Sequence, residues 1–562
     1  MPPYLWTTRC IPAFSIATVI VLLIFALVIS PYGRGEKGRH HGETTWSQLV
    51  LGLYLVVLHV MSIAFPARVC WSMLDMNRRI KEAATVMPNT RRRRVASLKN
   101  EDGEKPFPVP LFVIILPAYK EDNTTLETTL RVLASHPQAR LCYHVYLAME
   151  EGEEKSDLKA ASLVSTFSSM FYNMSYTIHP SGLDGEAQGK SSNESWAAKQ
   201  ACRDYPEPSR KRDIVITVMD ADTHLSSRYF QQIARLHTDC AETSETTMYV
   251  PPLVFDRNLH RVPLFVRTAD MMWCGAGLSS LYSGSTICIP TSVYSLPMAL
   301  VEEVSGWDTG PGAIGEDLHM YLKCFFALSG NLNVQIVYSA ASQCNVQSDL
   351  VGIRGYVDGV VASANWTAFY TSTGLHKSLV PKQDTAAPYR PPPKPIHMTN
   401  LLTIFHRLFE AHFLPTHLAL ILTTTGLYSL IHPGFLIPHF LRWCLDFAGW
   451  CRLLGFTLMM CYFYLYAKYH HFCVELRQEE MRRAGLWEDI AEQDGFSMKV
   501  FQVTGLLECV LFPIGGFIFG AIPALQAVIS HLFTERLTYV VSLKPLAAVR
   551  SRARAKSGSM TP

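Results

Sequence analysis

Long apolar runs at both ends of the chain limit what this sequence can fold into. Residues 13–30 contain no charged side chain, and a second, shorter apolar run covers residues 49–65. A helix needs about 20 apolar residues to cross the hydrocarbon core of a bilayer. We therefore predict two transmembrane helices within residues 1–75. The first run could instead be a signal peptide, but no small-residue cleavage site follows it.

A dense group of basic residues follows the second run and sets the expected orientation. Residues 76–105 include four consecutive arginines at positions 91–94. Positive side chains beside a transmembrane helix mark its cytosolic end, so we predict a basic cytosolic linker here and a cytosolic domain after it. The arginines could also be a nuclear signal. Beside two membrane spans, contact with anionic lipid head groups is the favoured interpretation.

The last third of the chain returns to membrane character. We predict a linker with an interfacial helix over residues 381–412, because residues 401–410 are amphipathic. A transmembrane region over residues 413–540 and a basic tail over residues 541–562 follow. The apolar run 500–533 contains prolines and glycines, and could form one tilted span or two short ones. The basic tail favours two spans there and six in all.

Between these regions, residues 106–380 have the pattern of a soluble α/β domain. Apolar runs at Leu111–Pro117 and Tyr143–Met149 have the length of buried strands, and a helical pattern at Thr124–Ala134 separates them. Asn123 is the expected N-cap of this helix. Strands that alternate with helices form a mostly parallel sheet, and such sheets bind ligands beyond the carboxyl ends of their strands.

Polar residues follow the predicted strands at that edge. Tyr119 and Glu121 follow the first strand, and Glu150 follows the second. A third apolar run ends at Asp220 and Asp222, whose carboxylates can point to one place because alternate strand residues share a face. Two such ligands suit Mg²⁺ or Mn²⁺ holding a diphosphate. By itself the pair could be a solvated turn, since a chain of this length contains about one Asp-x-Asp by chance.

Two small-residue segments could contact a phosphorylated ligand. Residues 182–194 are rich in glycine and could form a flexible loop that brings Lys190 to a diphosphate, although the spacing is not that of a P-loop. Solvation of this loop is the alternative. Ser283, Gly284 and Ser285 would let a sugar approach the backbone, or would simply form a turn.

A pair of carboxylates opens a helical pattern further along the chain. Glu316 and Asp317 precede apolar residues at helical spacing. The helix dipole alone favours acidic residues in a first turn. A carboxylate fixed at this point beside a metal–diphosphate site could also act as a general base.

Composition excludes some other classes of protein. The chain has 562 residues, of which 49% are hydrophobic and 17% are charged, and its net charge of +3 is too small to indicate nucleic-acid binding. Its 14 cysteines include no Cys-x-x-Cys pair, so the sequence predicts neither a zinc site nor a disulfide framework. Buried thiols in a reducing compartment are the expectation.

The order of these motifs resembles that of family 2 glycosyltransferases. The matching segments, from about residue 108 to 369, are Pro117-Ala118-Tyr119-Lys120-Glu121, the Gly-Lys loop, Asp220-Ala221-Asp222, the Ser-Gly-Ser segment and Gly315-Glu316-Asp317. The chain is similar to the membrane-embedded branch with chitin, hyaluronan and cellulose synthases, and most similar to fungal family 2-like transferases. The resemblance implies an α/β GT-A (Rossmann-like) catalytic domain inserted between N- and C-terminal transmembrane helices.

The resemblance also implies roles for the candidate residues. Asp317, with Glu316, matches the catalytic base, and Asp220 and Asp222 match the ligands of Mn²⁺ or Mg²⁺. The residues matched to the nucleotide sugar are Tyr119, Glu121, Glu150, Lys190 and Asp220. The residues expected at the acceptor are Ser283, Gly284, Ser285, Trp307 and Trp366.

The sequence departs from the family pattern at two places. Processive members carry a Gln-x-x-Arg-Trp motif, of which Trp366 is present, whereas Asn365 stands at the arginine position. Arg354 lies upstream and could substitute for it. Glu150 stands where the family usually has aspartate. These departures leave long-polymer synthesis and the contact with uridine open.

These observations predict a metal-dependent, inverting hexosyltransferase embedded in a plasma, Golgi or ER membrane. It would transfer a sugar from a UDP- or GDP-sugar to a lipid, metabolite or glycan acceptor on the cytosolic face. One alternative is a catalytically weakened homologue that serves as a membrane scaffold or partner subunit; another is a transporter. Four Asn-x-Ser/Thr sequons lie in the predicted cytosolic domain and should remain unglycosylated: Asn123, Asn173, Asn193 and Asn365.

Overall fold

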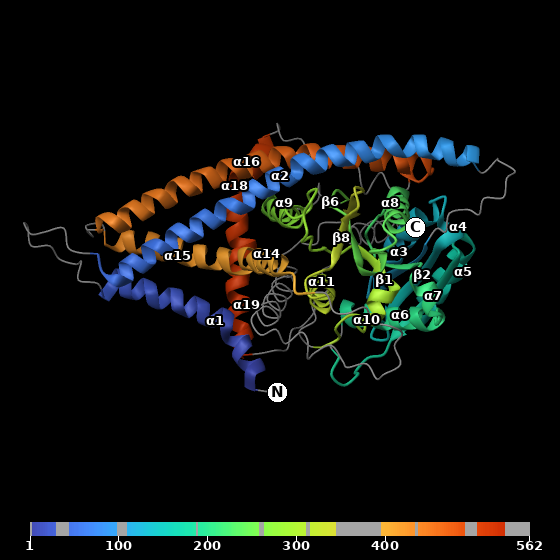
Figure 1. The fold of residues 1–562 in the computed structure, drawn as a ribbon, viewed down its shortest axis with the longest axis horizontal. Coiled ribbons are helices and arrows are strands. Elements are labelled where there is room, and N and C mark those ends of the chain that lie inside the picture. Colours follow the sequence, from blue (N-terminus) through green and yellow to red (C-terminus); the bar gives the residue numbers. More distant parts are fainter. Residues whose placement is uncertain are drawn as a thin grey trace, which may run out of the picture.

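The structure, a computed structural model, consists of long helices and an α/β domain that lies beside them (Figure 1). It describes residues 3–29, 44–97, 110–186, 189–257, 264–310, 315–343, 395–432, 437–488 and 503–533. The α/β domain is formed by the middle of the sequence, and the long helices come from both ends of the chain. The predicted fold class, a GT-A-like α/β domain inserted between apolar helices, is confirmed.

The long helices are continuous over several apolar segments. Their bounds are α1 Pro3–Leu23 with η1 Ile24–Ile29, α2 Trp46–Ser97, α14 Met398–Leu408 with η5 Phe409–Phe413 and α15 Leu414–Ile431, α16 His439–Arg483, and α18 Val503–Gly516 with η6 Phe517–Ala521 and α19 Ile522–Phe533. Among the described residues, five helical segments are long and apolar enough to cross a membrane: Cys10–Ile29, Trp46–Thr85, Met398–Ile431, His439–Arg483 and Leu507–Gln526.

The prediction of two short spans within residues 500–533 is corrected by this helix pattern. Residues 503–533 form one helical path, and Pro513 lies inside α18 without ending it. A proline in such a helix is tolerated where local π-helical turns and neighbouring helices compensate for the lost hydrogen bond. The described residues therefore contain five candidate spans instead of the six expected.

Two helices are much longer than a bilayer is thick. α2 has 52 residues and α16 has 45. At 1.5 Å per residue they extend over about 78 and 68 Å, whereas a hydrocarbon core measures about 30 Å. The two helices pack along each other (Figure 1). Part of each must therefore lie outside a membrane, and the end of this pair reaches the α/β domain.

The α/β domain is built on a seven-stranded sheet of order β3-β2-β1-β4-β7-β5-β8. The strands are β1 Leu111–Ala118, β2 Tyr143–Glu150, β3 Asn173–His179, β4 Ile214–Val218, β5 Thr247–Val250, β7 Tyr294–Pro297 and β8 Asn333–Ile336. Strands β1 to β4 are parallel, and β7 is antiparallel to β4 and β5. A separate two-stranded sheet pairs β6 Leu253–Phe255 with β9 Ala341–Gln343.

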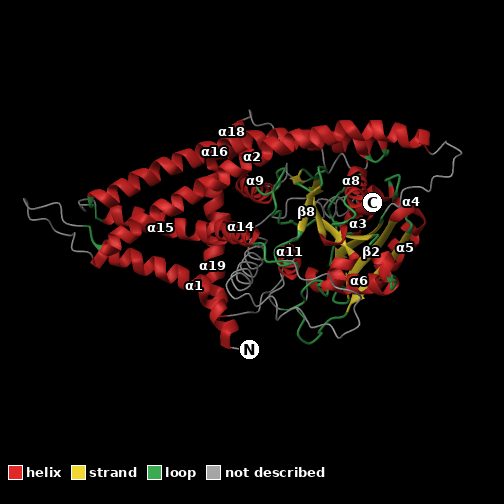
Figure 2. Cartoon of the chain, viewed as in Figure 1, coloured by secondary structure: helices red, strands yellow, loops and turns green. Residues whose placement is uncertain are grey.

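Helices surround the sheet, as Figure 2 shows. The main ones are α3 Asn123–Ala134, α5 Ser156–Phe167, α6 Lys190–Asp204, α8 Ser227–Asp239, α9 Leu264–Leu278, α10 Met298–Glu303 and α11 Glu316–Ala327; shorter turns are α4 Ala139–Cys142, η2 Ser168–Met170, α7 Pro208–Lys211 and η3 Ser244–Thr246. The central strands β1, β2 and β4 are almost fully buried, as their apolar sequences require.

Two local predictions differ from the structure. Asn123 is the first residue of α3, and the N-cap position belongs to Asp122. The end of the predicted flexible loop is helical, because Lys190 to Glu194 form the first turns of α6. Gly189 precedes this helix with φ of +148°, a conformation open to glycine, and so lets the chain turn into α6.

Candidate active site

The Asp220–Asp222 segment is a turn beyond strand β4. The strand ends at Val218, and the Thr223 amide donates to the Asp220 carbonyl at 2.9 Å. The alternation of side chains along a strand therefore cannot explain a common direction of the Asp220 and Asp222 carboxylates. The Asp220 side chain is 29% exposed, whereas Asp222 is only 3% exposed. The buried Arg257 guanidinium donates to the backbone carbonyl of Asp222 and fixes that side of the turn.

Lys190 joins this turn to helix α11. Its Nζ lies 2.7 Å from Asp220 Oδ1 and 2.5 Å from Glu316 Oε1. Burial opposes the charge of Lys190, but the neighbouring carboxylates raise its pKa well above the ordinary value. The ammonium group therefore stays charged and holds together two carboxylates that are about one hundred residues apart in the sequence.

Asp317 lies beside this pair at the start of α11. Its Oδ2 accepts a hydrogen bond from the Ser292 amide at 2.5 Å. Its Oδ1 is buried and has no hydrogen-bond partner within the described part of the chain. Burial, and then repulsion from Glu316, raise the pKa of Asp317 to about 8. A carboxylate of this pKa is a stronger base than an ordinary one, which suits it to removing a proton near neutral pH.

Glu194 is a further acidic residue of this cluster that the sequence analysis missed. It is 0% exposed, and neither carboxylate oxygen has a hydrogen-bond partner among the residues described. Its Oε1 lies 3.7 Å from Lys190 Nζ. Burial raises the pKa of Glu194 well above its usual range, which favours the neutral form of this group. Only the knowledge that Lys190 begins a helix would have placed residue 194 on the same face.

The residues predicted to hold the nucleoside lie at the same sheet edge. β1 pairs in parallel with both β2 and β4, so Tyr119 and Asp220, which follow β1 and β4, lie at the same edge as Glu150, the last residue of β2. Lys120, at φ of +57°, places its ammonium 4.8 Å from the centre of the Tyr119 ring. The carbonyl of Glu121 accepts from Lys159 at 2.5 Å. Glu150 is 7% exposed, and burial raises its pKa.

The predicted acceptor residues lie in separate surroundings. The Ser283 amide donates to Asp75 Oδ2 at 2.6 Å, so this turn is fixed to α2. Gly284 has φ of +86°, and Ser285 Oγ donates to a carbonyl of its own loop.

The two tryptophans among the predicted acceptor residues have different outcomes. Trp307 is 2% exposed, and its indole N–H donates to the Tyr294 hydroxyl at 2.6 Å, so the ring belongs to the core. Trp366, together with Asn365 and Arg354, lies outside the described residues. The role of these positions in acceptor binding stays a prediction.

The predicted metal ligands are carboxylates, which a hard cation prefers, but one oxygen of Asp220 is paired with Lys190. Asp220 presents a carboxylate that is open to solvent, and its Oδ2 lies 3.5 Å from the Gln343 amide nitrogen. Within the described ranges, no group of three or more His, Cys, Asp or Glu side chains converges to hold a metal. A hard cation at Asp220 and Asp222 would therefore complete its shell with diphosphate and water oxygens, and Lys190 would have to leave Asp220 Oδ1.

Comparison with known proteins shows which protein family this domain resembles. Residues 215–372 match the family described as "Glycosyl transferase family group 2". The matched region begins in β4 and includes Asp220, Asp222, Glu316 and Asp317. The match supports a family 2 glycosyltransferase domain in this chain. No curated protein matches the chain.

Several solved structures resemble the chain at low identity. A mannosyltransferase, PcManGT from Pyrobaculum calidifontis in complex with GDP-Man and Mn²⁺, is 15% identical over 71% of this chain and 98% of its own, with a TM-score of 0.34. Residues 1–349 of TarS from S. aureus are 10% identical over 47% and 72%, with a TM-score of 0.28. A mycobacterial protein is 11% identical over 47% and 75%, also with a TM-score of 0.28. Scores this low support no conclusion about activity.

Proposed function

We propose that this protein is a membrane-bound inverting glycosyltransferase that uses a nucleotide-sugar donor. The observation that carries the proposal is the contact of Lys190 with both Asp220 and Glu316. It brings the predicted diphosphate side of the site next to Asp317, the predicted base. A single hexose could then contact both groups, as direct displacement at its anomeric carbon requires. The family match over residues 215–372 supports the same reaction class.

Lys190 and helix α6 are suited to hold the donor diphosphate. Lys190 is the first residue of this 15-residue helix, whose N-terminal amides and dipole favour a phosphate group. Asp220 and Glu316 neutralise the lysine, and the diphosphate oxygens of a bound donor would take their place. A divalent cation held by Asp220 and Asp222 would neutralise the leaving diphosphate.

Asp317 is suited to accept the proton of the acceptor hydroxyl. As that oxygen forms its bond to the anomeric carbon, the bond from this carbon to the diphosphate oxygen breaks and the nucleoside diphosphate leaves. The proton passes to Oδ1 of Asp317, the oxygen without a hydrogen-bond partner among the described residues. The Ser292 amide holds the other oxygen and so fixes the orientation of the carboxylate.

The test is nucleoside diphosphate release by the full chain in detergent or nanodiscs. A panel of UDP- and GDP-sugars with Mn²⁺ or Mg²⁺ should contain at least one donor that is bound and turned over. Asp317→Asn should abolish transfer, whereas Glu154→Gln, at a side chain that is 90% exposed, should not. The proposal is wrong if the wild-type chain neither binds nor hydrolyses any donor. Binding without release would favour the scaffold alternative.

A further inference from the structure

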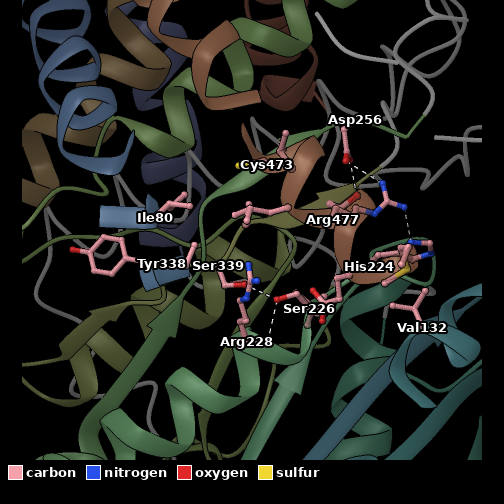
Figure 3. A pocket seen from close by; sticks show the side chains of 18 residues that line it. Ile80, Val132, His224, Ser226, Arg228, Asp256, Tyr338, Ser339, Cys473 and Arg477 are labelled. Atoms are coloured by element: carbon pink, nitrogen blue, oxygen red, sulfur yellow. Dashed lines mark hydrogen bonds and ion pairs between the residues drawn. The ribbon is translucent and has the colours of Figure 1, made fainter. Parts of the chain in front are cut away.

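The C-terminal end of helix α16 contacts the segment that follows the Asp220–Asp222 turn. A pocket lies at this junction, and Figure 3 shows its lining side chains. The ones that matter here are His224, Ser226, Asp256, Ser342, Arg477 and Glu480. Arg477 and Glu480 lie one turn apart near the end of a helix that also contains a candidate membrane span. The junction thus connects a membrane helix to the predicted metal–diphosphate turn.

Arg477 makes two polar contacts at this junction. One nitrogen of its guanidinium lies 3.0 Å from Asp256 Oδ2, and another lies 2.8 Å from His224 Nδ1 (Figure 3). The Arg477 side chain is 13% exposed and that of Asp256 is 2% exposed. Water therefore screens these contacts little. A guanidinium group can only donate hydrogen bonds, so Nδ1 of His224 accepts from Arg477.

Asp256 also contacts strand β9 and so connects Arg477 to that strand. Its Oδ1 accepts from Ser342 Oγ at 2.5 Å, and the Ser342 backbone forms a bridge with His224. The next residue of β9, Gln343, donates to Thr223 Oγ1 at 3.1 Å and lies 3.5 Å from Asp220 Oδ2. One side of the turn is therefore held by the strand that Asp256 fixes.

Arg257, the residue after Asp256, holds the other side of the turn. Arg257 is 1% exposed and donates to the carbonyl of Asp222. Its position depends on that of Asp256, because the two residues share a peptide unit and both amides face the Gln343 carbonyl. Both sides of the Asp220–Asp222 turn are thus held by residues whose positions depend on Asp256.

Other side chains of α16 hold the same small sheet and the helix beside it. The Tyr469 hydroxyl donates to the Leu253 carbonyl at 2.7 Å, and His470 Nε2 lies 3.2 Å from the Phe255 carbonyl. Glu480 accepts from the Ser227 amide at 2.8 Å, at the N-terminus of α8, where the helix dipole favours an acidic group. Side chains of α16 therefore hold both strand β6 and the start of α8.

We propose that Arg477 is a positioning residue for the donor site, through which α16 holds the Asp220–Asp222 turn in its binding geometry. It acts through Asp256 and His224 and does not touch substrate. The inference rests on the proposed function, because it assumes that this turn binds the metal–diphosphate of a donor. The new element is that donor affinity depends on Arg477, a side chain of a candidate membrane helix that is 253 residues from His224 in the sequence.

The test compares Arg477→Gln with a control on the same helix. Arg483→Gln is the control, because the Arg483 side chain is 64% exposed and pairs only with Glu479 among the described residues. Arg477→Gln should raise the KM for the donor about tenfold and lower kcat less than about threefold, since the turn is displaced while Asp317 is not. Arg477→Lys keeps the charge but not the two-pronged geometry, and should be intermediate.

A second variant keeps the inference testable if Arg477→Gln fails to fold. Ser342→Ala removes one contact of Asp256 and leaves the Arg477–Asp256 ion pair in place, so it should raise the donor KM in the same direction by a smaller factor. A donor KM unchanged in both variants, or a loss confined to kcat, would overturn the role of Arg477. Wild-type protein that turns over no donor would instead overturn the proposed function itself.

Discussion

Replacing Asp317 by asparagine should stabilise the folded domain at alkaline pH while it removes activity. The pKa of Asp317 is raised from 3.8 to about 8, chiefly by burial. Below the unfolded pKa both states are protonated, and the group does not contribute to the pH dependence. Between pH 4 and 8 the unfolded chain releases its proton while the folded chain keeps it. The free energy of unfolding therefore falls as pH rises, and the full loss is reached above about pH 8.

The size of this effect follows from the shift and from the surroundings of Asp317. One pKa unit corresponds to about 1.36 kcal/mol, so the shift sets an upper limit of about 6 kcal/mol. The Asp317 carboxyl oxygen Oδ1 is buried but the residue as a whole is half-buried, so water screens part of this shift and we expect about 2 kcal/mol. Asparagine cannot ionise, and its amide oxygen can still accept from the Ser292 amide. For a domain of roughly 200 residues, about 2 kcal/mol raises the unfolding midpoint by about 4–8 °C.

Thermal unfolding of wild-type and Asp317→Asn protein at pH 5 and pH 8.5 measures this effect. The variant should gain much more stability over wild type at pH 8.5 than at pH 5, and should release no nucleoside diphosphate at either pH. A stability difference that is the same at both pH values would refute the burial of an ionisable Asp317. Wild-type transfer activity in the variant would refute its role as the base.

Three further predictions concern Lys190, the metal ion and the membrane topology. Lys190→Met should weaken donor binding about 10- to 100-fold, because a charged contact to the diphosphate is lost; the control Lys199→Met, on an exposed part of α6, should bind normally in the same titration. EDTA should stop nucleoside diphosphate release and added Mn²⁺ should restore it; full activity in excess EDTA would contradict the predicted metal dependence. Asn173 is exposed in the α/β domain. Mass spectrometry of the protein from eukaryotic cells should find it unglycosylated, and a glycan there would contradict the cytosolic orientation.

Much of the scaffold could be predicted from local patterns. The apolar runs Leu111–Pro117 and Tyr143–Met149 predicted β1 and β2 within one residue of their observed ends, because a strand buried on both faces must be apolar along its whole length. The apolar run before Asp220 likewise forms β4. Parallel pairing of these strands then placed Tyr119, Glu150 and Asp220 at one edge. Of the two alternatives for residues 500–533, the favoured one of two short spans did not form, since Pro513 lies inside α18 and a π-helical turn continues this helix into α19.

The candidate membrane helices, the central strands and the acidic residues that follow them can be predicted from the amino-acid order alone, because burial imposes a hydrophobic periodicity that is visible locally. Folding in three dimensions is what makes Lys190 bridge Asp220 and Glu316, buries Glu194 beside them, and brings Arg477 to His224. Taken singly, these are ordinary polar residues of helices. Their contacts join segments far apart in the chain, and a contact of that kind leaves no periodic trace in the sequence.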